Sequence, residues 1–137
     1  MFEAISIKKE VVFEREESLR LSVRGLDDDD KKLFHQKFSE DLRDPDTYAV
    51  LNFFFVAGLH HFYLGKNLRG LVNIIVFSVG VVSIFLNFAG LGLTLIIAIV
   101  LIELPALFRA QLLVSHYNNE LSDRLLQQIK SDNLGSE

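Results

Sequence analysis

The sequence predicts an all-α integral membrane protein of two to three spans, with a small N-terminal β-hairpin followed by an amphipathic helix, and a second amphipathic helix at the C-terminus. Half of the 137 residues are hydrophobic, yet 23% are charged. The two kinds are separated, because 22 of the 32 charged residues lie in the first 47 positions. No charged residue occurs from Leu71 to Ile102, a run of 32 residues, whereas about 20 apolar residues suffice to cross a bilayer as a helix.

The N-terminal residues 3–24 alternate with a period of two. Apolar residues stand at odd positions and charged residues mostly at even ones. Because alternate residues of a strand share a face, the pattern predicts a hairpin over residues 3–24 that turns near residues 15–17. A lone hairpin is marginally stable in water, so its apolar face must cover its own following helix, a second copy or a partner.

Residues 27–43 are predicted to form a short amphipathic helix. Four consecutive aspartates from Asp27 stand at its start, where the helix dipole favours acids. Apolar residues then recur at every fourth position from Phe34 to Leu42, and Pro45 ends the pattern. Residues 1–46 are therefore expected to form a soluble head.

The membrane domain is expected over residues 47–110, with spans at about 48–64, 69–86 and 91–108. As one helix, the charge-free run would be about 48 Å long, against about 30 Å of hydrocarbon. We therefore place a break at residues 87–92, which read Asn-Phe-Ala-Gly-Leu-Gly. A single long, tilted helix is the alternative, and it would leave two spans.

Residues 111–137 are predicted to form an amphipathic helix and a tail. Leu113, Tyr117, Leu121 and Leu125 repeat every four residues, with polar residues between them. Such a face packs on the protein's own soluble part, on a second copy or on a partner. The candidate partner-binding residues on this helix and on the hairpin are Ile5, Ile7, Leu19, Leu21, Val23, Leu121 and Leu125.

The N-terminus is expected to stay in the cytoplasm, because Met1 leads into charged residues without the apolar segment of a signal peptide. Lysines and arginines flank the expected spans equally on both sides, so the positive-inside rule does not set the orientation.

The stretch from Ala57 to Gly70 carries a recognisable motif. It reads Ala-Gly-Leu-His-His-Phe-Tyr-Leu-Gly-Lys, followed by Arg69 and Gly70. It resembles the two-transmembrane-segment (TM-two) domain family, whose motif is Gly-x-His/Asp-Arg-Phe-Tyr-Leu-Gly, and residues 90–92 and 102–105 resemble that family's glycine pair and terminal acid. The resemblance covers roughly residues 48–118. It implies a bacterial inner-membrane accessory module of largely undefined activity.

The chain departs from the family pattern at two positions. His61 stands where the family has arginine, and Glu103 where it has aspartate. The motif and polar residues taken as the candidate site are Gly58, His60, His61, Phe62, Tyr63, Gly65, Arg69, Gly70, Glu103, Pro105 and Arg109.

Glu103 is the one acid inside an expected span, and a carboxylate there needs a partner. We expect a cluster at one face of the membrane, comprising His60, His61, Tyr63, Arg69, Glu103 and Arg109. The cluster either neutralises Glu103 as a structural anchor or handles protons or ions. No metal site is expected, because adjacent histidines on a helix point about 100° apart, and His35 and His116 lie in other helices.

The composition excludes several function classes. There is no cysteine for thiol chemistry, and the net charge of −4 argues against a nucleic-acid partner. We find no phosphate-binding loop, no nucleophile paired with a base and no cofactor motif, so no enzyme is expected. Two functions remain: a non-enzymatic anchoring, assembly or partner-binding subunit of a membrane complex, in contact with lipid and another membrane protein or a second copy, or a small oligomeric ion or proton conduit that uses Glu103.

Overall fold

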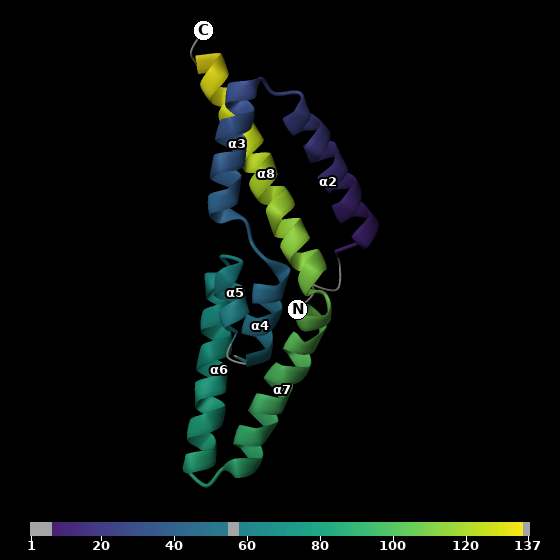
Figure 1. The fold of residues 1–137 in the computed structure, drawn as a ribbon. Coiled ribbons are helices and arrows are strands. Elements are labelled where there is room, and N and C mark those ends of the chain that lie inside the picture. The colour runs from purple at the N-terminus through teal and green to yellow at the C-terminus, as the bar shows by residue number, and fades with distance from the viewer. Residues whose placement is uncertain (1–6, 55–57, 136–137) are drawn as a thin grey trace. The chain divides into compact units, whose positions relative to one another are not determined.

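The computed structural model describes residues 7–54 and 58–135, and every element in these ranges is a helix. Figure 1 shows the ribbon. The chain divides into two compact units, which we treat separately. The apolar-helix unit comprises residues 44–111, and the three-helix unit comprises residues 7–43 and 112–135. The N-terminal residues 1–6 lie outside the described ranges.

The predicted β-hairpin is wrong. Residues Lys9–Arg24 form one continuous helix, α2. Its inward positions are Val12, Glu16, Leu19 and Val23, a spacing of four, three and four residues that follows the helical period. The odd-numbered Val11, Phe13 and Leu21 are 59%, 47% and 56% exposed.

Helix propensity explains why the alternation misled. Between Lys9 and Arg24 there is no glycine, proline, asparagine or aspartate with which a hairpin could turn. Glutamate, arginine and leucine dominate the segment and are good helix formers. An ion pair one turn apart, from Arg20 to Glu16 at 2.7 Å, adds local support.

Helix α3 (Asp28–Asp41) starts at the run of aspartates. The Asp27 carboxylate accepts hydrogen bonds from the backbone N–H groups of Asp29 and Asp30, at 3.1 and 2.9 Å. It is therefore the N-cap that satisfies the first free donors of the helix.

The core of the three-helix unit lies between α2, α3 and α8 (Ala110–Gly135), and all but the first two residues of α8 belong to this unit. Large apolar side chains fill the core, with Val23, Leu26 and Phe38 packed against them. Polar contacts fasten α2 to α8: Asn119 donates to the Val12 carbonyl at 2.8 Å, and Arg15 pairs with Asp123 at 2.6 Å. The buried core residues are Leu19, Phe34, Leu121, Leu125, Leu126 and Ile129.

In the apolar-helix unit, α6 (Asn67–Phe85) and α7 (Ala89–Phe108) form an antiparallel pair. The turn between them, residues 86–88, overlaps the start of the break predicted at residues 87–92, and Asn87 there has a φ of 65°. Both helices are long enough and apolar enough to cross a membrane, while only 17% and 22% of their most apolar windows are buried. The core helix of a soluble protein is mostly buried, and these two helices are not.

The first expected span, residues 48–64, is not one continuous helix. It contains most of α4 (Pro45–Phe54) and α5 (Leu59–Tyr63), and Gly58 between them has a left-handed φ of 85°. That backbone conformation interrupts an α-helix and suits glycine. The stretch therefore folds as two short helices, and the long apolar helices among the described residues are α6 and α7.

Candidate functional site

Two histidines are positioned by the shortness of α5. Gly58 precedes this helix and Gly65 follows it, both with left-handed φ angles of 85° and 69°. The N–H of His61 donates to the Gly58 carbonyl at 3.0 Å, and the N–H of Lys66 donates to the His61 carbonyl at 2.8 Å. These turns confine α5 to five residues and fix the directions of its side chains.

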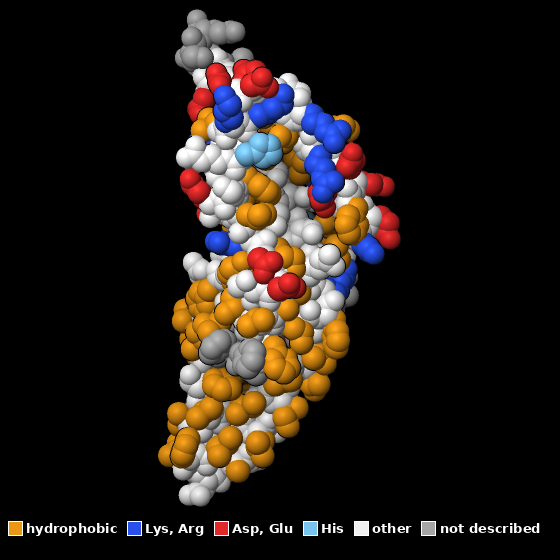
Figure 2. Space-filling view, in the orientation of Figure 1, with side chains coloured by type: hydrophobic (Ala, Val, Ile, Leu, Met, Phe, Trp, Pro, Cys, Tyr) orange, Lys and Arg blue, Asp and Glu red, His pale blue; other side chains and the backbone are white. Residues whose placement is uncertain are grey.

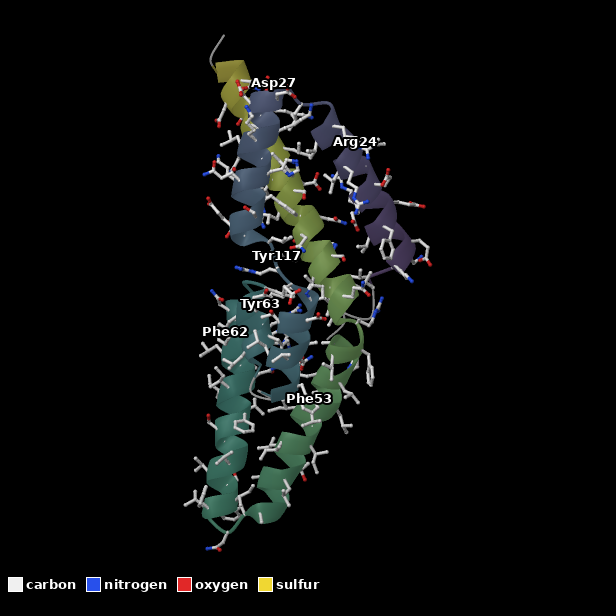
Figure 3. All side chains as sticks on the ribbon, in the orientation of Figure 1. Arg24, Asp27, Phe53, Phe62, Tyr63 and Tyr117 are labelled. Carbon is white, nitrogen blue, oxygen red and sulfur yellow. The ribbon has the colours of Figure 1, made fainter. Side chains whose placement is uncertain are left out.

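The close approach of α5 to α6 also requires the glycines of the motif. A Cβ on Gly58 would lie 2.6 Å from the Cβ of Asn73, so no larger residue fits there without a shift. A Cβ on Gly70 would overlap the ring of Phe62, which is labelled in Figure 3. The motif glycines therefore let α5 lie against α6, with Phe62 filling the space at Gly70.

Both histidines contact the carboxylate of Glu103 on α7. His60 Nε2 lies 3.1 Å from Oε2 of Glu103, and His61 Nε2 lies 3.1 Å from Oε1. Asn73 of α6 donates to Oε1 at 2.7 Å. One carboxylate thus joins α5, α6 and α7, and we call these four residues the Glu103 cluster.

Three of the four residues of the Glu103 cluster are buried, and Asn73 is half-buried. His60 is fully buried and Glu103 is 9% exposed. The ring of Tyr48 packs edge-on against His60, with 5.3 Å between ring centres, and Asn52 reaches the Glu103 carbonyl at 3.5 Å. Nδ1 of His60 is buried and has no hydrogen-bond partner among the described residues.

The cluster lies near one end of the apolar pair. Glu103 is six residues before Arg109, which is about 9 Å along a helix. Asn73 follows Arg69 by four residues near the start of α6. The polar side chains therefore sit about one to two turns from a charged end, rather than midway along the apolar surface.

The structure brings together three members of the predicted cluster, His60, His61 and Glu103. Tyr63, labelled in Figure 3, instead accepts a hydrogen bond from the Asp44 N–H at 2.9 Å. Arg109 caps the end of α7, and its N–H donates to the carbonyl of Pro105 at 3.2 Å. Arg69 stands in the first turn of α6, where its N–H donates to the Lys66 carbonyl.

Sequence reasoning missed Asn73 as a partner of Glu103. Nothing in the spacing of Asn73 from Glu103 pointed to that acid. The one sequence signal that could have drawn attention to Asn73 is its position one helical turn after Arg69, a residue of the predicted cluster.

The partner-binding candidates are mostly used inside the three-helix unit. Leu19, Leu121 and Leu125 are buried core residues, and Val23 packs against them. Leu21 is exposed, Ile7 is half-buried, and Ile5 lies outside the described residues. The apolar faces that were expected to bind a partner therefore pack against each other, because residues 9–24 form a helix rather than a hairpin.

The three-helix unit keeps an open groove of about 490 Å³ between α2, α3 and α8. Its apolar lining includes Leu19, Phe34, Phe38 and Leu42, and Leu42 is 47% exposed. Basic and acidic side chains also line it. These charged and ionisable residues are Arg20, Arg24, His35 and Glu16, and Figure 3 labels Arg24 at the end of α2.

Comparison of the chain with models of protein families, with curated proteins and with solved structures finds no match.

Proposed function

We propose that the chain is a non-enzymatic integral membrane protein that serves as an anchoring, assembly or partner-binding subunit of a larger membrane complex. The observation that carries this proposal is the inverted burial of α6 and α7. Their buried positions include Gly70, Gly80, Ser83, Gly92 and Glu103. Their valine, isoleucine, leucine and phenylalanine side chains are largely exposed, and Figure 2 shows hydrophobic side chains covering this part of the surface.

Lipid explains the inversion. Membrane helices associate through small residues and polar contacts, since lipid tails are as apolar as leucine and drive no burial of large side chains. In water, the same exposed surface would be an aggregation hazard. The motif resemblance at residues 57–70 supports placement in a bacterial inner membrane.

We assign partner binding to the groove of the three-helix unit. Its floor is apolar, while Arg24 and His35 at its edge form no ion pair among the described residues. Arg20 is already paired with Glu16. The expected occupant is an amphipathic helix of a partner protein, with apolar side chains in the groove and a carboxylate beside Arg24.

The test is purification of the whole chain in mild detergent from its native host, followed by the mass and composition of the complex. We expect a heteromeric complex that Leu42→Glu, inside the groove, disrupts. Leu21→Glu is the matched control, because Leu21 is 56% exposed and Leu42 is 47% exposed, but Leu21 does not line the groove.

Three outcomes would contradict the proposal. A closed ring of this chain alone would favour the conduit that uses Glu103. A monomer without a partner would remove the assembly role. Equal loss of partner from both leucine variants would place the binding surface outside the groove.

A further inference from the structure

The Glu103 cluster contains three potential metal ligands that converge. Nitrogen atoms of His60 and His61 and a carboxylate oxygen of Glu103 all lie within 4.8 Å of one another. Each Nε2 lies 3.1 Å from a different oxygen of the same carboxylate. Ligands about 2.0–2.1 Å from a zinc ion in a tetrahedral site lie about 3.3 Å apart. The spacing of the nitrogens from the carboxylate is therefore close to that of neighbouring ligands around one ion.

We propose that His60, His61 and Glu103 bind a divalent transition-metal ion of the zinc type. The inference is independent of the proposed partner-binding role, because it concerns other residues.

The geometry of α5 removes the main objection that the sequence raises. Adjacent residues of a helix point about 100° apart, which disfavours the binding of one metal ion by two neighbouring histidines. Here the two imidazole rings lie 4.1 Å apart with an angle of 45° between them, and both Nε2 atoms face Glu103. A five-residue helix between two left-handed glycines gives the side chains this convergence.

The donor set selects the class of ion. Two imidazoles and one carboxylate suit zinc and related first-row metals, whereas calcium and magnesium take oxygen ligands. Three protein ligands leave a fourth position of a tetrahedral ion open. Asn73 holds one oxygen of Glu103 at 2.7 Å, as outer hydrogen bonds do when they orient a ligating carboxylate.

The surroundings also set the expected strength. When Nε2 binds a metal, the proton of a neutral imidazole moves to Nδ1, which then needs an acceptor. Nδ1 of His60 is buried without such a partner among the described residues. Loss of an outer partner costs about 10–100-fold in metal affinity. We therefore expect a dissociation constant in the micromolar range, weaker than in structural zinc sites.

The experiment uses the full chain purified in mild detergent and stripped with a chelator. Zn²⁺ is titrated by calorimetry, stoichiometry is measured by elemental analysis, and Co²⁺ is added separately to read the visible absorption of the bound ion. We expect one ion per chain and the intense Co²⁺ absorption of a tetrahedral site. Glu103→Gln and His61→Gln should each weaken Zn²⁺ binding at least tenfold.

The matched control is the double variant His35→Ala, His116→Ala, which removes the histidines outside the cluster. It should bind Zn²⁺ as the unmodified chain does. His61→Gln leaves the bonds of Glu103 to His60 and Asn73 in place, so it tests the site even where Glu103→Gln alters folding, and circular dichroism identifies such a case. The proposal is overturned if the folded, unmodified chain takes up no stoichiometric Zn²⁺. It is also overturned if binding follows the control histidines, or if it survives in folded His61→Gln.

Discussion

The long apolar helices of one unit and the core of the other bury different sets of residues. In the three-helix unit, Leu19, Phe34 and Ile129 are 5%, 4% and 1% exposed. In the apolar-helix unit, α6 and α7 bury three glycines, a serine, a glutamate, an alanine and one isoleucine, Ile99, and expose most of their other isoleucines and leucines. The physics of packing is the same in both units, and the proposed placement of α6 and α7 in a membrane accounts for the difference: water drives large apolar side chains inward, and lipid does not.

The largest effect should come from placing a charge on equally exposed apolar positions of the two units. Ile97, near the middle of α7, is 55% exposed, and Leu21 of α2 is 56% exposed. We expect Ile97→Asp to disfavour membrane insertion by about 3–4 kcal/mol, since a carboxylate at the centre of a spanning helix costs about 2.5–3.5 kcal/mol and a favourable isoleucine is lost. Leu21→Asp should be nearly neutral. The measurement is the fraction of chains that resists alkaline extraction from membranes.

Equal behaviour of the two aspartate variants would break the comparison. It would mean that α6 and α7 lie in water or against protein rather than in lipid.

A smaller effect is expected where α6 and α7 approach most closely. A Cβ on Gly92 would overlap the Gly80 carbonyl oxygen and would lie 2.6 Å from Ile84, whereas a Cβ on Gly90 meets nothing within 4 Å. Gly92→Ala should destabilise the pair by about 1–3 kcal/mol through overpacking against backbone. Gly90→Ala should be neutral or slightly stabilising, because alanine is the better helix former. Thermal unfolding in detergent compares them, and similar shifts would show that the close crossing is absent.

Sequence could predict the features that local chemistry decides. The aspartate run stands at the start of α3, and the charge-free run turns at Asn87, because helix starts and breaks depend on a few neighbouring residues. The alternation over residues 3–24 misled because the same residues also fit a helical stripe through Val12, Leu19 and Val23, and only the partner helix decides between the two periods. The contact of Glu103 with His60 and Asn73 spans 43 and 30 positions, so no spacing rule could fix it.

Exposed charges of the three-helix unit should contribute little, in contrast to the buried Glu103. Arg15 pairs with Asp123 at 2.6 Å, but their side chains are 54% and 30% exposed. A double-mutant cycle with Arg15→Ala and Asp123→Ala should give a coupling of about 0.2–1 kcal/mol, because water screens the pair. The coupling should fall as salt rises. A coupling that salt does not change would show that the pair is shielded from water, and would blur the distinction between the units.

The smallest effect concerns the start of α4, in the apolar-helix unit but outside its two long helices. The backbone N–H of Thr47 donates to the Asp44 carboxylate at 2.7 Å, and the Thr47 hydroxyl donates to it at 2.9 Å. These two bonds, the backbone one first, hold the pKa of Asp44 below its usual range. A carboxyl group whose pKa is lower in the folded state stabilises the fold above its unfolded pKa. That contribution is lost as pH falls through the folded value.

Asp44→Asn keeps an acceptor for Thr47 but removes the charge, since asparagine caps helices about as well as aspartate. The variant should therefore be slightly less stable than the unmodified chain near pH 7, and the difference should vanish under acid conditions below the pKa of Asp44. Thermal unfolding in detergent across this pH range gives the measurement. Asp46→Asn is the control for charge, because it leaves both Thr47 bonds to Asp44 intact. A difference that grows toward acid would assign the pH dependence of α4 to another group and leave the Asp44 cap without an electrostatic role.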